Sequence, residues 1–412
     1  MRQIRLHFLI LLILLSTGVQ LFAQTWVERT PIPTSRWYPC SVVIDEKIYV
    51  IGGMGETSPY SSLTIVEVYD VPGDSCETMT PMTMSRWGAM AAVVDNKIYV
   101  IGGLTGSFVG GYSATDAAEV YDPGTNTWTA IAPIPSARGW GGCAVVNDTI
   151  FVFGGYGGLS SAVLKYYPPK DTWFTEANMP NGRYTFMTAQ ANDKVYLIGG
   201  WGSDLVQEYD PVTKVWTTMA SMPTSRGASG IAVINDTIYV AGGRGGNSRQ
   251  FECFNPVINT WASLSPMPTA REGLIGAAVD GRFFAIAGSV PVSQGGFPFY
   301  NIVEEADFSG TGISEGAITP YFLTNLSVQP NPFNLHTSIS FTLDNPQSVE
   351  LCVFDLTGRR IAVLVDGLLE TGPHCYNWEG MDLNGQTVAS GTYILRITSA
   401  QSAAKKKVLL LR

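Results

Sequence analysis

The chain has 412 residues, of which 45% are apolar and only 14% charged, so it can bury a large core and should form two or more compact units. Its formal net charge of −9 makes nucleic acid a poor partner, because binding to phosphates needs a basic surface. The six cysteines include no C-x-x-C pair, and no histidine lies within residues 24–309. We therefore expect no metal, no cofactor and no histidine-based catalytic triad in that part of the chain.

Residues 1–23 have the pattern of a secretory signal peptide. Arg2 and Arg5 precede an apolar run at 6–15, and Ala23 supplies a small residue at the expected cleavage point. An uncleaved anchor is the alternative, but the apolar run is short for a hydrocarbon core of about 30 Å. We expect a mature chain that begins near Gln24, leaves the cytoplasm and has no integral membrane segment after the signal is removed.

A fixed spacing recurs six times after the signal. An arginine is followed sixteen residues later by Gly-Gly or, once, Ala-Gly, at Arg36/Gly52, Arg86/Gly102, Arg138/Gly154, Arg183/Gly199, Arg226/Gly242 and Arg271/Ala287. Ten residues before each arginine stands a tryptophan or, once, a cysteine, at Trp26, Cys76, Trp128, Trp173, Trp216 and Trp261. Only the segment after each glycine pair varies in length, which is typical of a packing unit with one tolerant loop.

Each unit contains four short apolar runs separated by turn residues, for example Asp45-Glu46 between the first two runs. Asn and Asp tolerate the backbone of tight hairpins, so the runs predict four antiparallel strands, the blade of a β-propeller. The Gly pair, the Tyr69-Asp70 step and the spaced tryptophan resemble the kelch family, which implies a six-bladed propeller over residues 24–309. The last unit lacks its tryptophan, so we expect the segment around Trp26 to supply the outer strand of blade six.

Recurring arginines and glutamates could suggest an active site. Glu67, Glu119, Glu252 and Glu304 each stand two residues before the aromatic position of the third strand, which is Ala306 in the last unit. Catalysis needs one site and not several copies, so we interpret these residues as framework ion pairs, since an unpaired buried charge is costly.

Residues 326–412 have a different all-β pattern, which predicts a small immunoglobulin-like β-sandwich after a linker at 310–325. This unit resembles the type A sorting domain of type IX secretion through Asn331-Pro332-Phe333, Phe354-Asp355, Gly358-Arg359, Trp378, Gly380, Asn384-Gly385, 389–393 and the basic-apolar end 405–412. The resemblance implies contact with the type IX machinery and a secreted or outer-surface location in a Gram-negative bacterium. An ordinary accessory sandwich is the alternative. Cys352 and Cys375 could form a disulfide within it.

Strand parity places the arginine connections and the variable loops on the same face of the propeller. That face is aromatic, so we predict a ligand-binding surface of Trp37, Tyr38, Trp87, Trp140, Tyr156, Tyr184, Trp201 and Arg244. The three long loops add Tyr60, Phe108, Tyr112, Phe297 and Phe299. The alternative is that these rings fill the channel mouth and pack between the blades.

These features favour a recognition protein that binds an extracellular glycan or protein. One alternative is a carbohydrate-active enzyme such as a sugar mutarotase or epimerase, with Glu272 as acid-base and Arg244 as anion-binding residue. A second alternative is a passive surface scaffold, because propeller architecture alone does not define a function.

Overall fold

The computed structural model describes residues 24–56, 60–246, 248–308, 323–343, 346–355, 360–383, 385–399 and 403–411. The predicted signal peptide lies outside this range, as do most of the predicted linker and several residues of the sorting-domain motifs, Gly358, Arg359 and Asn384 among them. Strand β29 begins at Leu323, inside the segment 310–325 that was expected to be linker.

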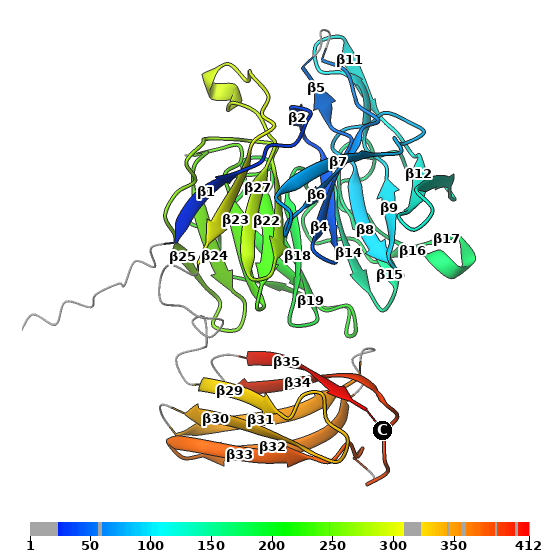
Figure 1. Ribbon diagram of the computed structural model, residues 1–412. Helices are drawn as coiled ribbons and strands as arrows, with labels where there is room; N and C mark the ends of the chain where they lie inside the picture. The colour runs from blue at the N-terminus through cyan, green and yellow to red at the C-terminus, as the bar shows by residue number, and fades with distance from the viewer. Residues whose placement is uncertain are drawn as a thin grey trace, which may run out of the picture.

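Six four-stranded antiparallel sheets make up residues 24–308 (Figure 1). The first strands are β3 (Cys40–Ile44), β8 (Met90–Val94), β14 (Gly142–Val146), β18 (Met187–Ala191), β22 (Gly230–Ile234) and β26 (Ile275–Val279). The second strands are β4 (Lys47–Ile51), β9 (Lys97–Ile101), β15 (Thr149–Phe153), β19 (Lys194–Ile198), β23 (Thr237–Ala241) and β27 (Arg282–Ile286). The first strands contact one another in a closed circle, which makes the six sheets the blades of a propeller.

The outer half of each blade follows the same order. The third strands are β6 (Val66–Asp70), β12 (Ala118–Asp122), β16 (Val163–Tyr167), β20 (Val206–Tyr209), β24 (Phe251–Asn255) and β28 (Val303–Asp307). The fourth strands are β7 (Ser75–Met79), β13 (Thr127–Ala130), β17 (Thr172–Glu176), β21 (Trp216–Thr218), β25 (Thr260–Ser263) and, from the N-terminal segment, β1 (Thr25–Arg29). Strand β1 pairs with β28 from Thr25–Asp307 to Arg29–Val303, so both ends of the propeller segment share blade six, as the missing tryptophan indicated.

The sixteen-residue spacing corresponds to a hydrogen bond between the arginine and the backbone at the glycine pair. The guanidinium of Arg36 donates to the carbonyl of Gly52 at 3.2 Å, and the arginines of blades two, three, four and six make the equivalent bond. Blade five differs, since Ser229 donates to the Gly242 carbonyl at 2.9 Å and Arg226 turns to Val240. A side chain at Gly52 would lie 2.5 Å from the Arg86 carbonyl oxygen, which explains why this position is glycine.

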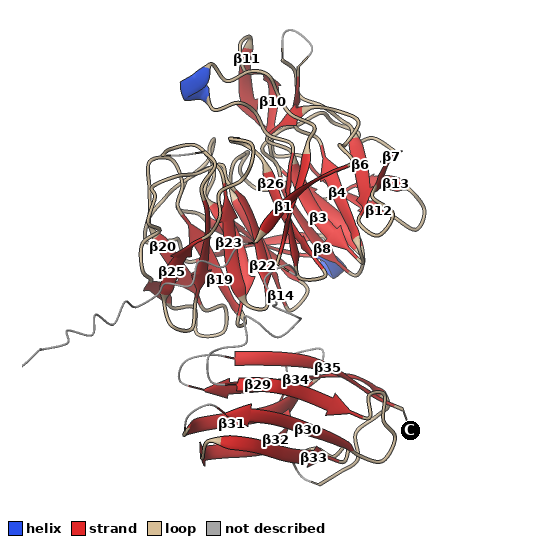
Figure 2. Cartoon of the chain, turned by 60° about the vertical axis from the view of Figure 1, so that its left-hand side comes forward, coloured by secondary structure: helices blue, strands red, loops and turns tan. Residues whose placement is uncertain are grey.

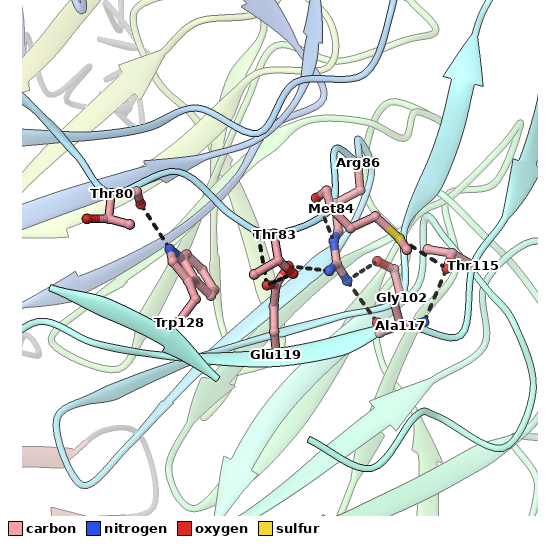
Figure 3. Close-up of polar contacts among 9 residues, drawn as sticks. All are labelled: Thr80, Thr83, Met84, Arg86, Gly102, Thr115, Ala117, Glu119 and Trp128. Carbon is pink, nitrogen blue, oxygen red and sulfur yellow. Dashed lines mark hydrogen bonds and ion pairs between the residues drawn. The ribbon is translucent and has the colours of Figure 1, made fainter. Parts of the chain in front are cut away.

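Four of the six arginines form buried ion pairs, as expected: Arg36–Glu67, Arg86–Glu119, Arg226–Glu252 and Arg271–Glu304. Figure 3 shows the pair in blade two, where Glu119 also accepts a hydrogen bond from the Thr83 hydroxyl at 2.6 Å. Trp128 donates to the Thr80 carbonyl at 2.9 Å and so ties its blade to the preceding one (Figure 3). The repeated charges are therefore framework contacts.

The C-terminal unit is a two-layered β-sandwich. One sheet contains β29 (Leu323–Gln329), β30 (Thr337–Leu343) and β33 (Gly372–Trp378). The other contains β32 (Arg360–Leu369), β31 (Gln347–Phe354), β34 (Gly391–Ser399) and β35 (Ala403–Leu410). Its core brings together three motif residues, since the ring centroid of Trp378 lies 5.4 Å from that of Phe333 and 5.0 Å from that of Tyr393.

Asn331 and Phe333 hold the C-terminal strand β35 from its outer edge. The Asn331 side chain donates to the Lys407 carbonyl and accepts from the Leu409 amide, both at 2.8 Å. The Phe333 amide donates to the Leu409 carbonyl at 2.9 Å. Two motifs that are distant in the sequence thus form one contact.

The disulfide that we considered between Cys352 and Cys375 is absent, because both cysteines are free. Cys352 is buried on β31, whereas Cys375 is exposed on β33, a strand of the other sheet.

Candidate functional site

The arginine connections and the loops after the glycine pairs lie side by side on one face of the propeller. Strand β2 (Arg36–Trp37) pairs with β5 (Met54–Gly55), and bridges join Trp87 to Leu104, Gly139 to Tyr156, Gly227 to Arg244 and Glu272 to Ser289 in later blades. Figure 2 shows that the hairpin of β10 (Leu104–Ser107) and β11 (Gly111–Ala114) projects from this end of the propeller. In blade four the Trp201 amide donates to the Tyr184 carbonyl at 3.3 Å, so the face is built from six equivalent pairs of segments.

A closed ring of backbone hydrogen bonds lies at the centre of this face. Each blade contributes the second residue after its arginine, and each amide donates to the equivalent carbonyl of the preceding blade at 2.7 to 2.9 Å. All six residues have a left-handed backbone, with φ from 50° to 62°, and they are Tyr38, Gly88, Trp140, Thr185, Ala228 and Gly273. The sequence pattern did not predict this backbone ring, although the small residues Gly88, Ala228 and Gly273 at three of the six positions were a possible signal.

Two glycines of the backbone ring make room for indoles. A side-chain carbon at Gly88 would lie 2.6 Å from Cδ1 of Trp140, and one at Gly273 would lie 2.3 Å from Cδ1 of Trp37. These positions need glycine for space as well as for their positive φ.

Three of the eight predicted binding residues are buried. Trp87 is 0% exposed, and Trp37 and Tyr38 are also buried, with ring centroids 6.2 Å apart for Trp37–Trp87 and 5.9 Å apart for Tyr38–Trp87. Trp140 is half-buried and packs edge-on against Trp87 at 5.1 Å. This corrects the expectation of one exposed aromatic wall, because stacking on a ligand needs a free ring face. Trp37, Tyr38 and Trp87 pack in a buried cluster with Met54, Leu104 and Phe299, in line with the alternative interpretation that these rings serve packing.

The long loops of blades six, one and two explain this burial. Ser62 donates to the Gly106 carbonyl at 3.1 Å, and the Phe299 amide donates to the Glu56 carboxylate at 2.6 Å, so the loops bind one another. Phe108 lies 5.3 Å and Phe299 5.7 Å from Trp37, measured between ring centroids. The loops therefore cover the indoles beneath them.

Blades three to five have short loops and leave their rings accessible. Tyr156 is 42% and Trp201 is 54% exposed, and Tyr184 between them is half-buried. The centroids are 6.1 Å apart for Tyr156–Tyr184 and 6.2 Å apart for Tyr184–Trp201. The guanidinium of Arg244 lies 4.1 Å above the Trp201 ring. We call these four residues the exposed row.

A hollow of about 110 Å³ lies where the exposed row meets the backbone ring. Within the described residues Arg244 forms no ion pair. The hydroxyls of Thr185 and Ser225 form no side-chain hydrogen bond in the same residues. The lining is otherwise aromatic or small, and consists of Tyr38, Thr185, Trp201, Gly202, Ser225, Gly227, Ala228, Arg244 and Gly245.

Glu272 lies next to this hollow and is 1% exposed. Its Oε1 atom has no hydrogen-bond partner. Burial raises the pKa of the Glu272 carboxyl, whereas a hydrogen bond from the Val292 backbone and the charge of Arg244 lower it. The residue after it, Gly273, is hydrogen-bonded to Ala228 and Tyr38, and both of these line the hollow together with Arg244. Glu272 and Arg244 therefore belong to adjoining parts of this face, but the carboxyl is enclosed.

Within the described part of the chain, no group of three or more His, Cys, Asp or Glu side chains could hold a metal ion. No helix in the same residues is long and apolar enough to cross a membrane.

Comparison with known proteins agrees with this architecture. Residues 12–155 match the KLHDC2/KLHL20/DRC7 Kelch-repeats domain, and residues 141–180, 183–223 and 225–268 each match the Kelch motif. Residues 331–403 match the FlgD Ig-like domain. No curated protein sequence matches the chain.

Among solved structures, one titled "Structure of YjhT" has a TM-score of 0.57 and 17% sequence identity, and the match covers 66% of this chain and 95% of that one. At this identity the similarity shows the fold alone. Residues 24–308 thus form a six-bladed kelch β-propeller, followed by a β-sandwich similar to the FlgD immunoglobulin-like domain.

Proposed function

We propose that this protein is a recognition protein, and that its kelch propeller binds an extracellular glycan or protein through the exposed row. The observation that supports the proposal most strongly is the accessibility of Tyr156 and Trp201, at 42% and 54%, on the same face as the buried rings of Trp37, Tyr38 and Trp87. Large rigid rings next to small polar groups bind ligands with little loss of conformational entropy.

A glycan array and a protein pull-down, both with the full chain, test this proposal. Trp201→Ala and Tyr156→Ala should each weaken a specific hit, because each removes an exposed ring. Phe174→Ala is a matched control, since Phe174 is 49% exposed but belongs to the outer strand β17. Binding that survives both row variants, or that Phe174→Ala weakens equally, would refute the proposed surface.

We also propose that residues 326–412 direct the protein through type IX secretion to the outer surface or the medium. The proposal is supported by the resemblance to the sorting domain, by the FlgD-like match at 331–403 and by the anchoring of β35 by Asn331. Fusion of residues 326–412 behind a signal peptide and a neutral reporter should move the reporter out of a type IX-competent host. A reporter retained in the periplasm would refute this role.

A further inference from the structure

The hollow beside the backbone ring is lined by one guanidinium, that of Arg244. Arg244 has no ion-pair partner within the described residues, so by itself it would favour an anionic ligand. Glu272, however, directly precedes Gly273, which is hydrogen-bonded to Ala228 and Tyr38 in the lining of the hollow, and the charge of Arg244 acts on its carboxyl. A carboxylate near a guanidinium offsets the attraction for anions, and the guanidinium in turn disfavours cations.

The groups that line the hollow are suited to hydroxyls. Thr185 and Ser225 carry hydroxyls that donate and accept, and Arg244 carries donors only. Within the described residues neither hydroxyl forms a side-chain hydrogen bond, and the guanidinium of Arg244 stacks on Trp201 without an ion-pair partner. A ligand hydroxyl can accept from Arg244 and donate to a threonine or serine oxygen at the same time. Carboxylates lack donors and ammonium groups lack acceptors, so they satisfy only part of this lining.

The size of the hollow limits what can enter. At about 110 Å³ it is well below the ~300 Å³ at which pockets begin to enclose a drug-sized ligand. This space fits one hydroxyl-bearing edge of a sugar ring and not a whole oligosaccharide. Trp201 forms one wall and continues into Tyr184 and Tyr156, on which further apolar sugar faces could lie.

We infer that the hollow binds the hydroxyl-bearing edge of the terminal residue of a neutral glycan, with Arg244, Thr185 and Ser225 contacting adjacent ring hydroxyls and Trp201, on which Arg244 stacks, forming the apolar wall. Glu272 acts on this subsite through its charge, which offsets that of Arg244. This inference rests on the proposed function and narrows it to a ligand class and a subsite.

Saturation-transfer NMR and titration calorimetry with the full chain test the inference. The probes are the methyl glycosides of mannose, galactose and glucose, with methyl glucuronide as the anionic counterpart and an acidic peptide as the protein-like counterpart. At least one neutral glycoside should bind more tightly than the glucuronide and the peptide. Tighter binding of the glucuronide or the peptide, or no binding of any neutral glycoside, would overturn the inference.

Variants then locate the subsite. Thr185→Val and Ser225→Ala should each weaken the neutral glycoside by roughly threefold to tenfold, the range expected for one lost hydrogen bond. Thr217→Val and Ser263→Ala make equivalent changes on the exposed outer strands β21 and β25 and should have no effect. Equal affinity of the Thr185 and Ser225 variants and these controls would overturn the assignment.

The variant Glu272→Gln tests the electrostatic role of Glu272. If Glu272 offsets the charge of Arg244, removing its charge should raise the affinity for glucuronide at least threefold while the neutral glycoside changes less. Unchanged selectivity would contradict that role. The proposed function and this inference can fail independently. If binding of an array ligand is lost in Trp201→Ala but is unaffected in the Thr185 and Ser225 variants, the exposed row is the binding surface and the hollow is not its subsite.

Discussion

The buried ion pairs of the framework allow a sharp test, because the chain contains its own comparison variants. In blade two Arg86 pairs with Glu119, which also accepts hydrogen bonds from the Thr83 amide and hydroxyl at 3.1 and 2.6 Å. Blade four has Gln207 at the equivalent position, bonded to Arg183 at 2.6 Å, and blade three has Leu164, which offers Arg138 no acceptor. Burial alone acts on Arg138 and lowers the pKa of its guanidinium.

We therefore predict a graded response at position 119. Glu119→Leu leaves a buried guanidinium without its carboxylate and should cost about 3–5 kcal/mol of unfolding free energy, the usual effect of breaking a buried pair. Glu119→Gln keeps an acceptor, as in blade four, and should cost about 1–2 kcal/mol. The reverse change, Leu164→Glu, gives Arg138 a carboxylate and should stabilise the protein or leave its stability unchanged.

Urea unfolding followed by tryptophan fluorescence and circular dichroism measures these differences. Glu77→Gln, a change on an exposed outer-strand side chain, should stay within about 0.5 kcal/mol of wild type and serves as the control. If Glu119→Leu costs no more than Glu77→Gln, or if Gln is worse than Leu at position 119, the charge-pairing argument is wrong.

Three further predictions concern the site and the sandwich. Glu272→Gln should raise the melting temperature at pH 8, because burial raises the folded-state pKa of Glu272 and disfavours its charged form. This gain should vanish as the pH falls towards the ordinary glutamate pKa of about 4.3. A gain that persists at that pH would contradict the charge argument. Gly88→Ala should cost at least ~2 kcal/mol and change the near-ultraviolet circular dichroism, since the new carbon would meet Trp140; an unaltered spectrum would refute this. Asn331→Ala should cost about 1–2 kcal/mol and speed hydrogen exchange of the Leu409 amide, and unchanged exchange would argue against the clamp on β35.

The blades could be predicted from the sequence because their framework contacts join residues at constant separations. In five of the six blades the arginine donates a hydrogen bond to the carbonyl sixteen residues later, which keeps this separation constant. Closure of blade six by β1 followed from the same regularity, because the missing tryptophan of the last unit stands at Trp26. Spacing along the chain was sufficient to predict those contacts that repeat from blade to blade.

The site could be predicted only in part. Residues after the six arginines share one backbone conformation, so the sequence indicated which side chains lie on the face. Their exposure depends on what covers them, and this differs between blades. Trp37 and Trp87 lie under the long loops of Phe108 and Phe299, whereas Trp201 lies beside short glycine-containing loops and stays open.

The sequence by itself determined the period, the six blades, the framework ion pairs and the change to a second β-unit, because these depend on fixed distances along the chain. Only the tertiary structure decided the closed backbone ring, the division of the aromatic residues into a buried cluster and an exposed row, and the hollow beside Arg244. Those features arise where loops of unequal length from different blades meet. No spacing within a single repeat carries that information.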